Sequence, residues 1–150
     1  MGYGVSRQRI YASLLALGAG FLLYRTITLI SQGALDIFVI WVSLLLIAEL
    51  LLDLSCLLSS LRWWIHNDRD QARIALRLGA AVTILHALRV LVFVIGRMGP
   101  WINFDVRPEH IASHAETWSW FGVYFAAIMA VLGVIGVIII WLLIRRAKKN

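Results

Sequence analysis

Four long runs of mostly apolar residues dominate the chain, at positions 10–30, 35–61, 74–98 and 121–144. Each is about as long as the ~20-residue helix that crosses the hydrocarbon core of a bilayer, and none contains proline. Hydrophobic residues make up 61% of the sequence and charged residues 15%, against about 45–50% and about 25% in soluble domains. We therefore predict an all-α integral membrane protein in which residues 1–150 form a single transmembrane domain.

The connections between the runs predict the architecture. Those after the first and second runs are short, so consecutive helices must lie antiparallel, which favours an antiparallel four-transmembrane-helix bundle. The third and fourth runs are joined by a longer outer loop at 99–120. Small residues recur every fourth position, as in Ala12, Ala16 and Gly20, a spacing that lets helix backbones approach closely. Gly133 and Gly136 make the fourth run a candidate for another close contact, including one with a second subunit.

Basic residues predict how the bundle is oriented. Nine of them flank the runs on one side, namely Arg7, Arg9, Arg62, Arg69, Arg73, Arg145, Arg146, Lys148 and Lys149, whereas Arg107 is the only one in the outer loop. By the positive-inside rule both termini are cytoplasmic, in a multi-pass protein of the cytoplasmic (plasma or inner) membrane. The formal net charge of +6 is concentrated at these helix ends. It therefore reports orientation, and we expect no nucleic-acid partner.

Ionisable residues inside the runs are the candidate site, as an intramembrane ligand site or ion pathway: Arg25, Glu49, Asp53, Arg77, His86 and Arg89. A charged side chain near the bilayer centre costs several kcal/mol unless it is paired or hydrated. Depths counted at about 1.5 Å per residue from the middle of each run predict a ladder of ion pairs. Asp36 would pair with Arg97, Glu49 with Arg89 or Arg25, and Asp53 with Arg77.

This ladder has two interpretations. Paired charges can fix helix register and the choice of partner, which is a structural role. Alternatively, Glu49 titrates with His86 beside it, since imidazole exchanges protons near neutral pH, and the chain conducts protons or transports a substrate. In either case Arg25 or Arg89 is left without an acid. An anionic ligand such as a lipid phosphate, or an acidic group of a partner subunit, could supply the missing charge.

Metal and redox chemistry have weaker signals. His110 and His114 are four residues apart and could chelate a metal if Pro108 begins a short helix; the alternative is an interfacial amphipathic segment. A bis-histidine haem would need a second ligand from a partner chain, because only His86 lies deep in a run. A quinone site near His86 and Arg89 is also open. No cofactor can be demonstrated from the sequence.

We therefore expect an accessory or structural subunit of a membrane complex, or a homo-oligomer, that contacts membrane lipids and other membrane subunits. The first alternative is a small transporter or a proton- or ion-conducting protein that uses Glu49 and His86. The second is a quinone- or haem-binding membrane anchor of a redox complex. No phosphate-binding loop, nucleophile elbow or zinc-protease motif occurs in the chain, so a non-enzymatic role is favoured.

Overall fold

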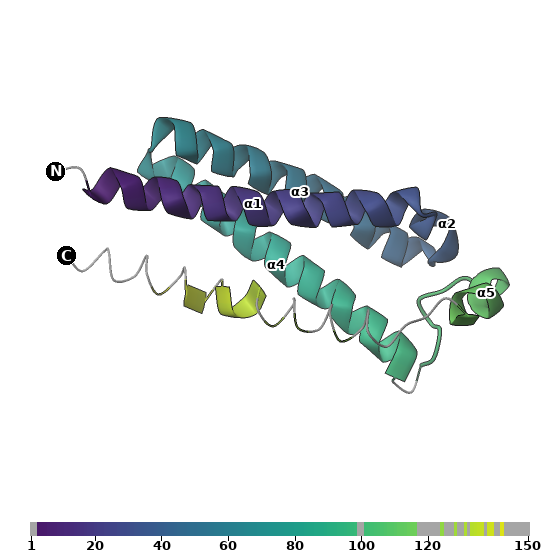
Figure 1. Cartoon of the computed structure of the whole chain (residues 1–150). Coiled ribbons are helices and arrows are strands. Elements are labelled where there is room, and N and C mark those ends of the chain that lie inside the picture. Colours follow the sequence, from purple (N-terminus) through teal and green to yellow (C-terminus); the bar gives the residue numbers. More distant parts are fainter. Residues whose placement is uncertain are drawn as a thin grey trace.

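The computed structural model of the chain describes residues 3–98 and 101–116 and ten positions between 124 and 142. The elements are α1 (Tyr3–Ser31), α2 (Ala34–Ile37), α3 (Ile40–His66), α4 (Arg69–Met98), the 3₁₀ helix η1 (Pro108–His110) and α5 (Ile111–Glu116) (Figure 1). Three segments are long and apolar enough to span a membrane: Arg7–Ser31, Ile40–His66 and Arg69–Arg97. An all-helical fold with three helices that could span a membrane is thus confirmed for the described residues. The predicted fourth span, 121–144, lies mostly outside them, so the number of helices in the bundle and the orientation of its termini stay predictions.

Helix α3 is the centre of the packing. It packs against both α1 and α4, whereas α1 and α4 have little direct contact with each other; the three helices are seen in Figure 1. Its buried face alternates steps of four and three residues: Val42, Leu46, Glu49, Asp53, Cys56, Ser60 and Trp63. On α1 the fully or almost fully buried residues follow every seventh position: Ala12, Ala19 and Thr26. A seven-residue repeat keeps one face of a helix against its neighbour over many turns, so the polar members of this face are held inside the bundle.

Two glycines lie where α4 comes close to other helical segments. A Cβ atom added at Gly79 would lie 2.8 Å from Cδ1 of Leu15 on α1. One added at Gly133 would lie 3.1 Å from Cγ2 of Thr83 on α4, so the close contact expected of Gly133 is made within the chain. On α1 the predicted four-residue spacing of small residues does not mark a single contact face, because Ala16 is only half-buried.

The second predicted run, 35–61, is interrupted near its start. Phe38 and Val39 have extended backbones, with ψ angles of 154° and 156°, so the short helix α2 ends there and α3 begins at Ile40. The turn before α2 passes through Gly33 at φ 86°, a left-handed conformation that favours glycine. The helical part of this run therefore extends from Ile40 to His66. Its middle is about five residues further along the chain than predicted, or roughly 7–8 Å along the helix axis.

Residues 101–107 fold back over this interruption. The Val39 N–H donates to the Asp105 carbonyl at 3.0 Å, and the Arg107 N–H donates to the Ile37 carbonyl at 2.9 Å. The Arg107 guanidinium donates to the carbonyls of Phe38 at 3.0 Å and Leu35 at 3.2 Å. These bonds provide partners for backbone groups at the end of α2, where the Ser43 hydroxyl also donates to the carbonyls of Leu35 and Phe38. Residues 101–107 are therefore bonded to the α2–α3 junction at this end of the bundle, which we call the loop end.

The same loop corrects one predicted ion pair. Arg97 pairs with Asp105, with Nη1 to Oδ1 at 3.0 Å and side-chain exposures of 4% and 2%, whereas Asp36 is exposed. The Asp36–Arg97 pairing was wrong because the loop brings a closer carboxylate to Arg97. Gly96 leaves room for it: a Cβ atom at that position would collide with the Asp105 carboxylate.

Candidate functional site: a buried polar cluster between three helices

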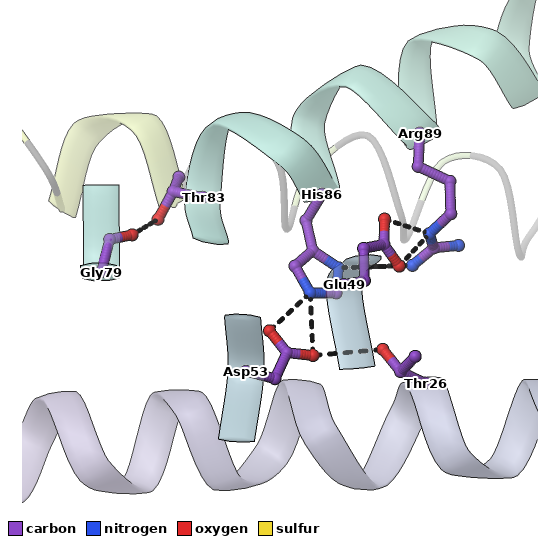
Figure 2. A network of polar contacts seen from close by, with 7 residues as sticks. All are labelled: Thr26, Glu49, Asp53, Gly79, Thr83, His86 and Arg89. Atoms are coloured by element: carbon purple, nitrogen blue, oxygen red, sulfur yellow. Dashed lines mark hydrogen bonds and ion pairs between the residues drawn. The ribbon is translucent and has the colours of Figure 1, made fainter. Parts of the chain in front are cut away.

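Five side chains from three helices meet inside the bundle, and we call them the polar cluster (Figure 2). They are Thr26 of α1, Glu49 and Asp53 of α3, and His86 and Arg89 of α4. Thr26, Glu49 and Asp53 are 0% exposed, and His86 is also buried. The two acids are one helical turn apart, as are His86 and Arg89, so each pair projects from one face of its helix. The faces of α3 and α4 meet at these residues.

Glu49 and Arg89 form the strongest contact of the cluster. The Arg89 Nε–H is 2.7 Å from each of the two Glu49 carboxylate oxygens. Bonds between ionised groups are short and about twice as strong as neutral ones. Of the two partners expected for Glu49, the structure therefore selects Arg89.

His86 lies between the two carboxylates. Its Nε2 is 3.0 Å from Oδ1 and 3.1 Å from Oδ2 of Asp53. Its Nδ1 is 3.7 Å from Oε2 of Glu49 and 3.4 Å from Nη2 of Arg89. Both ring nitrogens thus face side chains of the cluster, and ligation of a haem iron would have to displace one of them.

Thr26 ties α1 to the same cluster. Its hydroxyl donates to Oδ2 of Asp53 at 3.2 Å. Sequence analysis missed this residue, because a single threonine in an apolar run is not a distinctive feature. The signal that could have found it is its place seven residues after Ala19, which itself follows Ala12 by seven.

Two other candidates lie away from the cluster. Arg77 is exposed on α4, so the expected Asp53–Arg77 pair was wrong. The reason is the shift in α3: with its helix beginning at Ile40, Asp53 lies near the middle of the span and at the level of His86. Arg25 is also exposed and has no hydrogen bond or ion pair among the described residues. It is therefore Arg25, rather than Arg89, that has no acid in the described part of the chain.

The predicted metal ligands His110 and His114 are described only in part. His110 ends η1 and is half-buried, and His114 lies in α5, where its side chain is outside the described part of the structure. Within the described residues, no group of three or more His, Cys, Asp or Glu side chains is arranged to hold a metal ion. Metal binding at this pair stays a prediction.

Charge determines what the cluster can do chemically. It contains two carboxyl groups, a guanidinium that is always protonated and an imidazole that can carry one proton or two. Unpaired charge in a dry interior costs many kcal/mol. The arrangement is therefore suited to holding helices together and to binding protons.

Comparison of the chain with protein family models, curated proteins and solved structures gives no match.

Proposed function

We propose that this chain is a small multi-pass membrane protein that acts as an accessory or structural subunit of a membrane complex, or as a homo-oligomer. In this proposal the polar cluster fixes how its transmembrane helices pack. The observation that carries it is that buried hydrogen bonds and ion pairs join all three long helices at one level, with Asp53 bonded to both Thr26 and His86. Interhelical hydrogen bonds in membranes contribute about 0.6–2 kcal/mol each, and they also specify the register of the helices.

The outward-facing surface of the bundle supports association with lipids and other membrane subunits. Large apolar side chains of α1 are exposed along its length: Ile10, Leu14, Leu17, Phe21 and Tyr24. Such a surface suits a hydrocarbon environment or the helices of a partner. For topology we keep four transmembrane helices with both termini in the cytoplasm. The start of α1 and the α3–α4 connection lie at the same end of the bundle (Figure 1), where most of the flanking arginines are found.

The test compares Glu49→Gln with Asp36→Asn. The first removes the counter-charge of Arg89 inside the bundle, and the second removes an exposed carboxylate at the loop end. We expect Glu49→Gln to lower the stability of the detergent-extracted protein and to break up the assembly seen by native mass spectrometry, while Asp36→Asn behaves like the wild type. An intact and equally stable assembly with Glu49→Gln would contradict the structural role.

A second candidate is proton or ion conduction through Glu49 and His86. It is favoured by one observation: the imidazole lies between two carboxylates, 3.0 Å from one and 3.7 Å from the other, which forms a chain of proton donors and acceptors. The test is proton flux into liposomes that contain the purified protein and a pH-sensitive dye. Conduction predicts flux that Glu49→Gln and His86→Gln abolish and Asp36→Asn preserves. Flux equal to that of empty liposomes would exclude it.

A further inference from the structure

The two ring nitrogens of His86 have different surroundings. Nε2 is held by both oxygens of the Asp53 carboxylate, at 3.0 and 3.1 Å, so it carries a hydrogen that it donates to Asp53. Nδ1 has an acceptor and a donor beside it: the Glu49 carboxylate oxygen Oε2 at 3.7 Å and the Arg89 guanidinium nitrogen Nη2 at 3.4 Å. When Nδ1 is protonated, its hydrogen can face the Glu49 carboxylate. When it is not, its lone pair can accept a hydrogen from Arg89. This nitrogen is therefore the one with partners in both protonation states.

The charges of the cluster favour the protonated state. Glu49 and Asp53 together bring two negative charges, and Arg89 brings one positive charge. With a neutral His86 the buried cluster has a net charge of −1, whereas an imidazolium makes it zero. Thr26 is the residue of α1 that faces this site, and it is uncharged. No acidic or basic residue is found among the described positions of the C-terminal segment. Both Glu49 carboxylate oxygens lie 2.7 Å from the Arg89 Nε–H, and the Asp53 carboxylate accepts from Thr26 and faces Nε2 of His86 at 3.0 Å. Hydrogen bonds to the charged form of a carboxyl group favour that form, so these contacts support two ionised acids. The balancing positive charge then belongs on His86.

We propose that His86 binds an exchangeable proton at Nδ1, so that an imidazolium bridges Asp53 and Glu49 inside the membrane-spanning part of the bundle. The ligand is a proton taken from water: one N–H bond forms and no electrons are transferred. The Glu49–Arg89 ion pair stays ionised in both states. This inference does not depend on transport, since a proton bound and released from the same side involves no flux. It adds a binding function to a cluster whose proposed role is structural.

The experiment is ¹⁵N NMR of the full-length protein in lipid nanodiscs, with only its histidines labelled. The signals of a protonated and an unprotonated imidazole nitrogen are well separated, and a His86→Gln sample identifies the His86 pair among the four histidines. The wild type should show both His86 nitrogens protonated at neutral pH. A neutral His86, with one protonated and one unprotonated nitrogen, would overturn the proposal.

Charge-changing variants give opposite predictions for the same signals. Removing either acid with Glu49→Gln or Asp53→Asn leaves one carboxylate against Arg89, so His86 should lose its second proton. Removing the competing cation with Arg89→Gln should leave the imidazolium in place. Asp36→Asn is the matched control and should change nothing. If both acid variants keep a doubly protonated His86, the proposal fails. The His86 signals test proton binding alone, so this outcome is distinct from a failure of the structural role, which is measured by the stability of the assembly.

Discussion

His86 on α4 and Asp53 on α3 are thirty-three residues apart in sequence, yet Nε2 of His86 lies within 3.1 Å of both carboxylate oxygens of Asp53. The same carboxylate accepts a hydrogen bond from Thr26 of α1. A single buried side chain on the central helix thus contacts polar groups on both of its neighbours. Because lipid offers no replacement for these bonds, the helices can separate only at the expense of unpaired polar groups.

Arg89→Gln should destabilise the bundle far more than Arg77→Gln. Both arginines are on α4, but Arg89 is paired with the buried Glu49, and Arg77 is exposed. Leaving a buried charge without its partner costs about 3–5 kcal/mol, whereas an exposed substitution changes the free energy of unfolding by about 0.5 kcal/mol or less. Unfolding of the two variants in detergent micelles measures this difference. Equal stabilities would show that the Glu49–Arg89 pair does not hold the bundle together.

Thr26→Val should weaken the attachment of α1, and Thr28→Val is its control. Both replacements keep the shape of the side chain. The Thr26 hydroxyl donates to a carboxylate on another helix, whereas that of Thr28 donates to the Tyr24 carbonyl one turn earlier in α1. A hydrogen bond to a charged group contributes about 1.5–3 kcal/mol, so only the first variant should lower the unfolding free energy by that amount. A Thr26→Val protein as stable as the Thr28→Val protein would contradict the bond.

Gly79→Val should separate α1 from α4, whereas Gly18→Val should be tolerated. A Cβ atom at Gly79 already meets Leu15 at 2.8 Å, and one at Gly18 meets nothing within 4 Å. Overpacking of this kind costs about 1–3 kcal/mol. The measurement is the rate of disulfide crosslinking between single cysteines introduced on α1 and α4, which should fall in Gly79→Val alone. An unchanged rate would contradict the prediction and would mean that the Leu15 side chain makes room for valine without displacing α1.

Asp105→Asn should loosen the outer loop without unfolding the helices. Asp105 is buried and paired with Arg97, while Glu109 is exposed and its change to Gln provides the control. Hydrogen exchange at the backbone amides of Val39 and Arg107, which bond the loop to the junction of α2 and α3, should become faster only in Asp105→Asn. Unchanged protection of both amides would show that the ion pair does not hold the loop in place.

Much of the fold could be predicted from hydropathy alone, because a transmembrane helix must satisfy its backbone internally and its length is set by the bilayer. The same reasoning identified Glu49, Asp53, His86 and Arg89 as buried charges, and it named Arg89 as one of two partners for Glu49. The prediction of ion pairs failed where a break in the second run changed the depth at which its residues lie in the span. The break at Phe38 and Val39 is stabilised by the loop around Asp105 and Arg107, about seventy residues further along the chain, and no local pattern reveals it.

The pairing errors follow from that break. Counting depth from an uninterrupted helix placed Asp53 near Arg77, and it placed Asp36 at the height of Arg97. Because α3 begins at Ile40, Asp53 lies at the level of His86 and pairs with it. Arg97 pairs with Asp105 of the loop. Thr26 could not be predicted as a site residue, because its role depends on a hydrogen bond to Asp53 on another helix. Nothing in the apolar sequence around Thr26 indicates that bond.

A double-mutant cycle between Glu49→Gln and Arg89→Gln tests the central claim most directly, because it isolates the interaction of these two side chains across α3 and α4. Unfolding free energies of the wild type, both single variants and the double variant would be measured in the same detergent. A buried ion pair with both Nε contacts at 2.7 Å predicts a coupling energy of about 1–3 kcal/mol, with the double variant more stable than the sum of the single losses implies. Single losses that add to within about 0.5 kcal/mol would contradict the account, since they would mean that these residues do not interact inside the bundle.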